Sequence, residues 1–154
     1  MSPVIWSKSD GGNGHAYQLV AVSWGFTWEE AKKAAEASGG HLVTINSKAE
    51  NDFVYRLINK NASLWAVDKS GNGYGPWIGG YKKEGVKKAK EGWKWVTGEE
   101  VKYSSWASGE PNNYKNKENA ICFYRVSMTD KPTWNDVEQG IVLPACIVEF
   151  DNPK

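Results

Sequence analysis

Three absences narrow what this sequence can encode. It contains no apolar run approaching the roughly eighteen residues that a membrane-spanning helix needs. Its formal net charge is only +1, and no dense basic face suited to nucleic acid is visible. It has two cysteines, Cys122 and Cys146, too few for the disulfide framework of a small secreted domain. The sequence therefore predicts neither membrane insertion nor nucleic-acid binding.

Aromatic residues, in contrast, are abundant: nine tryptophans, seven tyrosines and four phenylalanines make up 13% of the 154 residues. Such large, rigid side chains suit either a loop-rich core or a surface that stacks on sugars, and we expect most of them in the core. The length fits a single domain, residues 1–154, that can bury a core of its own. Cys122 and Cys146 both fall in predicted strands, where a disulfide and two buried free thiols are equally compatible with the sequence.

Two capped helices are predicted in the first half of the chain. Thr27 precedes an apolar-periodic segment and is followed three residues later by Glu30, and Ser47 stands in the same relation to Glu50; both pairs have the form of a capping box. The first helix should end near Ala37, before two glycines. No partner at metal-ligand spacing follows His15, so it is predicted to be a surface residue. His41 stands where the first helix leads into a strand and is predicted to be a structural residue.

Several segments rich in β-branched and aromatic residues indicate strands. The last strand is expected to pair with the first and so bring the termini together. The lysines between 82 and 90 are interrupted by glutamates and are predicted to form a solvated loop. Strands or extended segments are predicted at residues 16–22, 41–45, 77–81, 93–96, 120–126 and 141–150.

The stretch from Glu110 to Asp136 is rich in hard oxygen donors. Carboxylates occur at Glu110, Glu118 and Asp136, and amide carbonyls at Asn112 and Asn135. No histidine or cysteine is interleaved, so the set favours calcium, which takes six to eight oxygen ligands, over zinc. Five side-chain oxygens and one backbone carbonyl would leave about two positions open.

Two adjacent sugar hydroxyls have the spacing to fill those two positions. Each could also hydrogen-bond to the ligands of the ion, because a carboxylate only accepts while an amide NH2 donates. Pro111 fits this arrangement, since a cis bond costs little before proline and a cis turn could direct Glu110 and Asn112 toward one point. Tyr114 is expected at the edge of the site, and Val137 could supply a small apolar contact.

Four motifs together resemble the C-type lectin-like domain: Glu-Pro-Asn at 110–112, Trp-Asn-Asp at 134–136, Trp-Ile-Gly-Gly at 77–80, and the helix pattern from Trp28 to Leu42. The resemblance covers about residues 15–150. It implies an α+β fold with two helices, two small antiparallel sheets, a long ligand-binding loop and paired terminal strands.

The resemblance also implies a cis bond before Pro111 and calcium-dependent binding of mannose, glucose, N-acetylglucosamine or fucose. The implied calcium ligands are Glu110, Asn112, Glu118, Asn135 and Asp136. The sugar-contacting residues expected from the motif and its flanks are Glu110, Asn112, Glu118, Asn135, Tyr114 and Val137.

This chain departs from the family in lacking its usual disulfide cysteines. A second, structural calcium is expected to be weak or absent, because Glu91, Asn113, Glu118 and Asn119 are accompanied by lysines and amides rather than acids. The alternative function is a calcium-independent scaffold that recognises proteins. An enzyme is not predicted, because ion-bound carboxylates are poor general acids.

The expected partner is a carbohydrate, and the expected location is secreted or extracellular, where weak calcium sites fill. Single-site sugar binding is weak in the family that this chain resembles, which favours an oligomer or a place in a larger protein.

Overall fold

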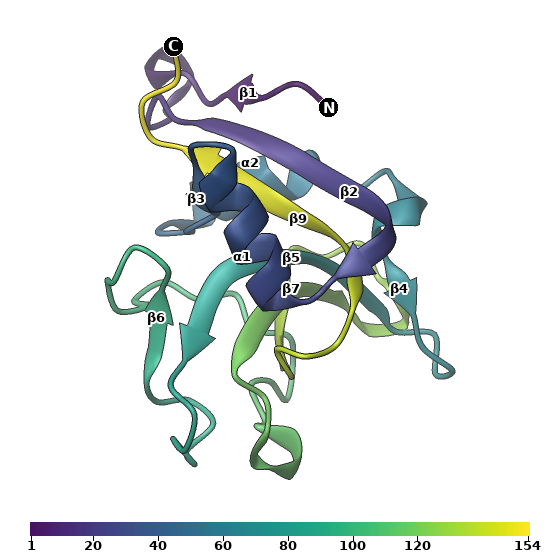
Figure 1. Cartoon of the computed structure of the whole chain (residues 1–154). Coiled ribbons are helices and arrows are strands. Elements are labelled where there is room, and N and C mark those ends of the chain that lie inside the picture. The colour runs from purple at the N-terminus through teal and green to yellow at the C-terminus, as the bar shows by residue number, and fades with distance from the viewer.

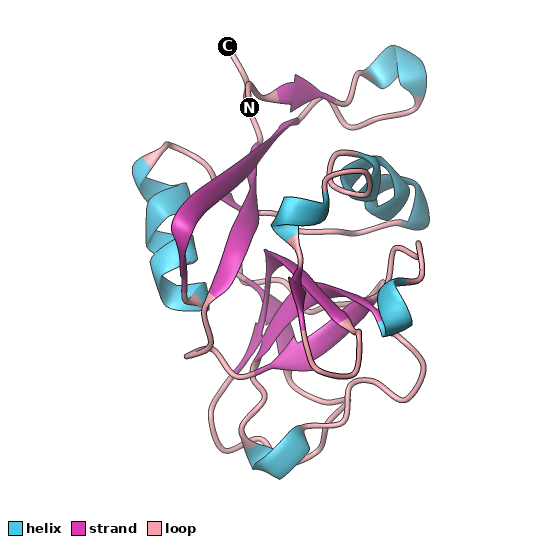
Figure 2. Ribbon diagram, turned by 90° about the vertical axis from the view of Figure 1, so that its right-hand side faces the viewer, coloured by secondary structure: helices cyan, strands magenta, loops and turns pink.

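The computed structural model describes residues 1–154 and confirms both predicted helices, α1 (Trp28–Ala37) and α2 (Lys48–Arg56). The Thr27 hydroxyl oxygen accepts a hydrogen bond from the Glu30 backbone N–H at 3.3 Å, and Ser47 accepts one from the Glu50 N–H at 3.1 Å. Each cap satisfies a backbone donor that the first turn of a helix leaves free. These helices lie on opposite sides of the β2–β9 pair (Figures 1 and 2).

Nine strands form one connected sheet in the order β1-β2-β9-β5-β7-β8, with β3 beside β9 and with β4 and β6 beside β5. The pairs are antiparallel, apart from one parallel bridge between Trp77 of β5 and Cys146 of β9. The resemblance implies two small antiparallel sheets, and this bridge joins the antiparallel groups into one sheet. The strands are β1 (Val4–Ile5), β2 (Ala16–Phe26), β3 (His41–Leu42), β4 (Ala66–Val67), β5 (Gly73–Lys82), β6 (Trp93–Trp95), β7 (Ala120–Arg125), β8 (Trp134–Val137) and β9 (Leu143–Phe150).

The first and last long strands pair as expected: Ala16 of β2 lies opposite Phe150 of β9. The termini therefore lie together at one end of the molecule, while the loop that follows Glu110 lies at the other end, toward the bottom of Figure 1. The Trp-Asn-Asp segment forms β8, a strand that the sequence pattern did not predict. Short 3₁₀ turns occur at Lys8–Asp10, Ala62–Leu64, Tyr114–Asn116 and Val126–Met128.

Most tryptophans belong to the core, as predicted. Trp95 and Trp134 are fully buried in one cluster, which α2 covers, and Trp77 is fully buried in the other, which α1 covers. Trp24 is the clear exception, with 81% of its surface exposed. Side chains of β7 and β8 pack into both clusters, so the core holds these two strands in place.

Cys122 and Cys146 are buried free thiols. Both lie opposite Trp77, Cys122 in β7 and Cys146 in β9, on the two sides of β5. Strands separated by one intervening strand are about 9.6 Å apart, beyond the roughly 7 Å that a disulfide can bridge. The alternative left open by the sequence is thus decided in favour of free thiols. No helix in the structure combines the length and the apolar character that crossing a membrane requires.

Candidate functional site

The turn at Glu110 is held against β8 by backbone hydrogen bonds. The Glu110–Pro111 peptide bond is cis, in agreement with the expectation from the sequence. The Glu110 N–H donates to the Ala107 carbonyl at 2.9 Å, and the Ala107 N–H donates to the Trp134 carbonyl at 2.9 Å. Glu110 is therefore placed beside the Trp-Asn-Asp segment although 24 to 26 positions separate them in the sequence.

Asp136 ties the two halves of the site together. Its side chain is fully buried, and its two oxygens accept hydrogen bonds from successive backbone N–H groups of the turn, Asn112 at 3.1 Å and Asn113 at 2.7 Å. Asn113 adopts φ 47°, a left-handed conformation that asparagine tolerates better than most residues. A carboxylate that accepts one bond at each oxygen keeps further lone pairs for a cation.

Glu118 is brought to the same turn. The Tyr114 N–H donates both to Glu118 Oε1, at 2.8 Å, and to Asn112 Oδ1, at 3.2 Å. The Glu118 N–H in turn donates to Asn113 Oδ1 at 3.2 Å. These shared donors place an oxygen of Asn112 and an oxygen of Glu118 side by side.

The carboxylates of the site raise one another's proton affinity. Burial, followed by the negative charge of Asp136, raises the pKa of Glu110 to about 7. The pKa of Glu118 is also raised to about 7, first by burial and then by Asp136 and Glu110, although the Tyr114 N–H opposes the shift. Burial likewise raises the pKa of Asp136. No lysine or arginine forms an ion pair with any of the three.

Two buried oxygen atoms of the predicted set have no hydrogen-bond partner, namely Glu110 Oε2 and Asn135 Oδ1. A buried polar atom without a partner costs about 1–3 kcal/mol, and both of these are oxygens, which can only accept. A bound cation would satisfy them. Three carboxylates and two amide oxygens form a hard donor set of the kind that calcium takes, so the residues fit the ion predicted from the sequence.

The two flanking residues differ in their accessibility. Tyr114 is 62% exposed, so it can reach a ligand at the rim of the site. Val137 is 3% exposed and packs in the core cluster that contains Trp77. The sugar contact expected of Val137 stays a prediction, and the burial of this side chain in the core counts against it.

Lys82, which the sequence placed in a solvated loop, is instead buried, with 3% of its surface exposed. Its ammonium nitrogen has no hydrogen-bond partner and lies 5.2 Å from the centre of the Trp93 ring. Burial lowers the pKa of Lys82, and Asp136 and Glu118 oppose that shift. The missed signal is its position at the end of a strand whose other residues are apolar or glycine. Lys82 thus places a positive charge next to the carboxylates.

A small cavity of about 220 Å³ lies beside the site, between the end of β5 and the 113–119 loop. It contains three of the four residues considered for a second calcium, but Glu91 lines a different groove. Three lysines lie around the cavity, and their charge opposes a divalent cation. The expectation of a weak or absent second ion remains a prediction, which this lining favours. The lining residues are Lys82, Lys83, Glu84, Gly85, Val86, Asn113, Asn116, Lys117, Glu118 and Asn119.

The fold and the site together define a lectin-like binding domain with a long loop supported on paired strands. The family model described as Lectin C-type domain matches residues 25–145. The chain therefore belongs to the C-type lectin domain family. Members of this family are binding proteins rather than enzymes, in agreement with the prediction.

Individual relatives support the same assignment. The C-type lectin lectoxin-Lio1 of Erythrolamprus poecilogyrus is 34% identical over 135 residues, which cover 85% of this chain and 69% of the relative. The EPNH mutant of CEL-I is similar in structure, with a TM-score of 0.66, 28% identity and coverage of 90% of this chain and 89% of the other. A calcium-independent type II antifreeze protein shares the fold at TM-score 0.64 and 22% identity, over 88% of this chain and 85% of the other.

Proposed function

We propose that this protein is a calcium-dependent carbohydrate-binding domain whose site is formed by the Glu110 turn and β8. The calcium ligands would be Glu110, Asn112, Glu118, Asn135 and Asp136, and the ligand would be a sugar of the mannose, glucose, N-acetylglucosamine or fucose type. Tyr114 would contribute a contact at the rim.

One observation carries this proposal: two buried oxygens without partners, Glu110 Oε2 and Asn135 Oδ1, belong to a group with three carboxylates. Proteins rarely bury acceptor atoms without satisfying them, and like charges placed together raise their pKa unless a cation balances them. The raised pKa values of Glu110 and Glu118 agree with a site shaped for a positive ion.

The sugar preference follows from the donors and acceptors of the turn. Glu110 offers only acceptors, whereas the amide of Asn112 can donate through nitrogen while its oxygen faces the ion. A pair of neighbouring hydroxyls could then bind to the ion and form one hydrogen bond of each kind. Calcium supplies the electrostatic attraction, and the protein groups select the orientation of the pair.

A calcium-independent recognition scaffold is the second candidate, and Lys82 is the observation that favours it. The Lys82 ammonium already supplies one positive charge near Asp136 and Glu118, so part of the negative charge is balanced without an ion. The structural likeness to a calcium-independent antifreeze protein shows that the fold does not require the ion.

Calorimetric titration with calcium, followed by methyl mannoside, separates these functions. We expect saturable calcium binding, and sugar binding only after calcium is added. Asn112→Ala should remove sugar binding while the melting temperature in chelator stays unchanged. Asn152→Ala is the matched control, because Asn152 is an exposed asparagine at the other end of the molecule. Mannoside binding retained by Asn112→Ala would exclude this site, and no calcium binding by the unmodified chain would favour the scaffold.

Specificity provides a second test of the same turn. Exchanging donor and acceptor, by combining Glu110→Gln with Asn112→Asp, should move the preference from mannose toward galactose. An unchanged preference would show that other residues select the sugar.

Location and assembly follow from the chemistry of such a site. An open calcium site of this kind fills at the calcium concentrations found outside cells, so we propose a secreted or extracellular role. Several copies of a weak site act together best, and an oligomer or a larger protein would provide them.

A further inference from the structure

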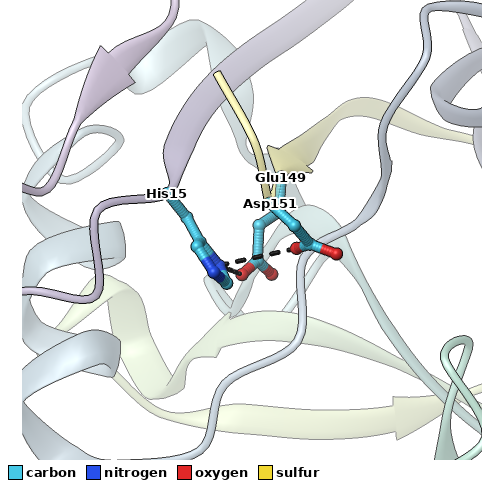
Figure 3. A group of neighbouring side chains, drawn as sticks. All are labelled: His15, Glu149 and Asp151. Carbon is cyan, nitrogen blue, oxygen red and sulfur yellow. Dashed lines mark hydrogen bonds and ion pairs between the residues drawn. The ribbon is translucent and has the colours of Figure 1, made fainter. Parts of the chain in front are cut away.

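The only two histidines of the chain meet at the end of the molecule far from the Glu110 turn. His15 lies immediately before β2, and the β2–β9 register places it opposite Asp151. His15 Nδ1 is 2.7 Å from Glu149 Oε1 and 3.5 Å from Asp151 Oδ1. Figure 3 shows the imidazole and the two carboxylates pointing toward one another. The absence of a nearby partner in the sequence had suggested a plain surface residue, but the partners come from the other end of the chain.

The three side chains form a compact set of nitrogen and oxygen donors. One ligand atom from each, namely His15 Nδ1, Glu149 Oε1 and Asp151 Oδ1, lies within 4.8 Å of the other two. Ligands bound to one tetrahedral zinc at about 2.0–2.2 Å are separated from each other by roughly 3.3–3.6 Å. The separation of 3.5 Å between His15 and Asp151 lies within that range, and the hydrogen-bond distance of 2.7 Å between His15 and Glu149 would lengthen when an ion enters between the two atoms.

Glu149 is held in place for such a role. It is 1% exposed, and its other oxygen, Oε2, accepts hydrogen bonds from the Thr44 N–H at 2.9 Å and the Thr44 hydroxyl at 3.2 Å. Oε1 is therefore free to face His15. Metal-binding carboxylates are commonly oriented by outer hydrogen bonds of this kind.

The second histidine, His41, contacts Asp151 of the cluster. Its Nδ1 lies 2.8 Å from the Leu42 carbonyl oxygen, which can only accept, so Nδ1 carries the proton. Its Nε2 lies 2.9 Å from the same Asp151 Oδ1 that faces His15. Although burial opposes the charged form, the Leu42 carbonyl and the Asp151 carboxylate raise the pKa of His41.

The carboxylates around the cluster give it a negative local charge, which favours a cation. Glu50 is buried nearby, with its Oε1 accepting from the Tyr17 hydroxyl at 2.8 Å, and it interacts electrostatically with Glu149 and His15. No lysine or arginine forms an ion pair with Glu50, Glu149 or Asp151. A groove of about 760 Å³, lined in part by His41 and Asp151, opens beside the cluster and gives an ion access.

We propose that His15 Nδ1, Glu149 Oε1 and Asp151 Oδ1 form a second metal site, separate from the calcium site, that takes a divalent transition ion of the zinc type. One imidazole with two carboxylates suits zinc better than calcium, which prefers oxygen ligands alone. The neutral imidazole would bind the ion through Nδ1 and carry its N–H on Nε2, which leaves a fourth position for water or for His41. The ion would join the start of β2 to the end of β9 in a chain without disulfides.

Calorimetric titration of the untagged full chain with zinc chloride tests this site. We expect one saturable site, together with a rise in melting temperature of roughly 5–10 °C when zinc is about 100 times its Kd. His15→Gln and Asp151→Asn should each weaken zinc binding by more than the roughly 10–100-fold that loss of an outer partner costs. Both changes affect partly exposed side chains, so the fold should survive them.

Two controls make the result specific. Asp52→Asn removes a carboxylate from α2 that pairs only with Lys48, and it should leave zinc binding unchanged. Glu110→Gln should also leave zinc binding unchanged while it weakens calcium binding, so failure of the zinc site and failure of the calcium site are distinguishable. Cobalt bound at the same site should give visible absorption bands that disappear in His15→Gln.

Three results would overturn the proposal. The first is the absence of saturable zinc binding up to millimolar concentration. The second is equal zinc affinity in His15→Gln, Asp151→Asn and the unmodified chain. The third is loss of zinc binding in Glu110→Gln alone, which would place the ion in the calcium site.

Discussion

Calcium binding at the Glu110 turn should depend steeply on pH between 6 and 8. Burial and the charge of Asp136 raise the pKa of Glu110 and of Glu118 to about 7, whereas an exposed glutamate titrates near 4.3. A carboxylate must lose its proton before it binds calcium. Protons therefore compete with the ion in a pH range where ordinary carboxylates are already ionised.

The size of the effect follows from these two pKa values. A group with a pKa of about 7 is roughly 90% ionised at pH 8 and roughly 10% ionised at pH 6. Each glutamate thus contributes about a tenfold loss of affinity over this interval. The two together give about 100-fold, or about 2.7 kcal/mol. Glutamates with a pKa near 4.5 would change the affinity by only a few per cent.

Calcium titrations at pH 6, 7 and 8 and at constant ionic strength measure this dependence. Glu110→Gln provides the matched comparison, because it removes one of the two titrating groups and keeps the size of the side chain. Its affinity should be lower at pH 8, and its loss between pH 8 and pH 6 should shrink to about tenfold. If the unmodified chain lost less than about threefold over the interval, the carboxylates would not be coupled as described.

Four further predictions concern stability and charge. Without calcium, stability should fall as the pH rises from about 4.5 to 7, because the folded state holds protons that the unfolded glutamates release earlier; thermal melts in chelator measure this. Lys82→Met should tighten calcium binding, on the order of tenfold, by removing a like charge beside Asp136, as titration at pH 8 would show. Trp134→Ala should cost about 3–5 kcal/mol in urea unfolding, whereas Trp24→Ala at an exposed position should cost less than about 0.5 kcal/mol. Reductant should not change the melting temperature, and thiol titration should detect Cys122 and Cys146 only after denaturation, since both are buried and unpaired.

Local sequence determined the helices and the outline of the sheet. The caps at Thr27 and Ser47 depend on a hydroxyl and a backbone N–H three residues apart, so the two helices could be predicted closely. The strand β8 was harder to predict, because Trp-Asn-Asp has no alternating apolar pattern. Its strand conformation comes from pairing with β7, opposite residues 120–123.

The ligand residues of the candidate calcium site could also be predicted from the sequence. The oxygen-donor residues, the proline between Glu110 and Asn112 and the offset to Glu118 are all properties of the sequence. Their fit to calcium depends on the fact that every donor atom is an oxygen. The structure brings three of the predicted ligands, Asn112, Glu118 and Asp136, to one turn through hydrogen bonds with the backbone of residues 112–114.

Only the tertiary structure decided which side chains are buried and which distant charges meet. Lys82 and Val137 looked accessible from their neighbours in sequence, but strand pairing turns both inward. His15 lacked any partner nearby, yet it meets Glu149 and Asp151 more than 130 positions away because β2 and β9 pair. Local propensities act over a few residues, whereas burial and electrostatic contact depend on the register between strands, which is set only when the whole sheet has formed.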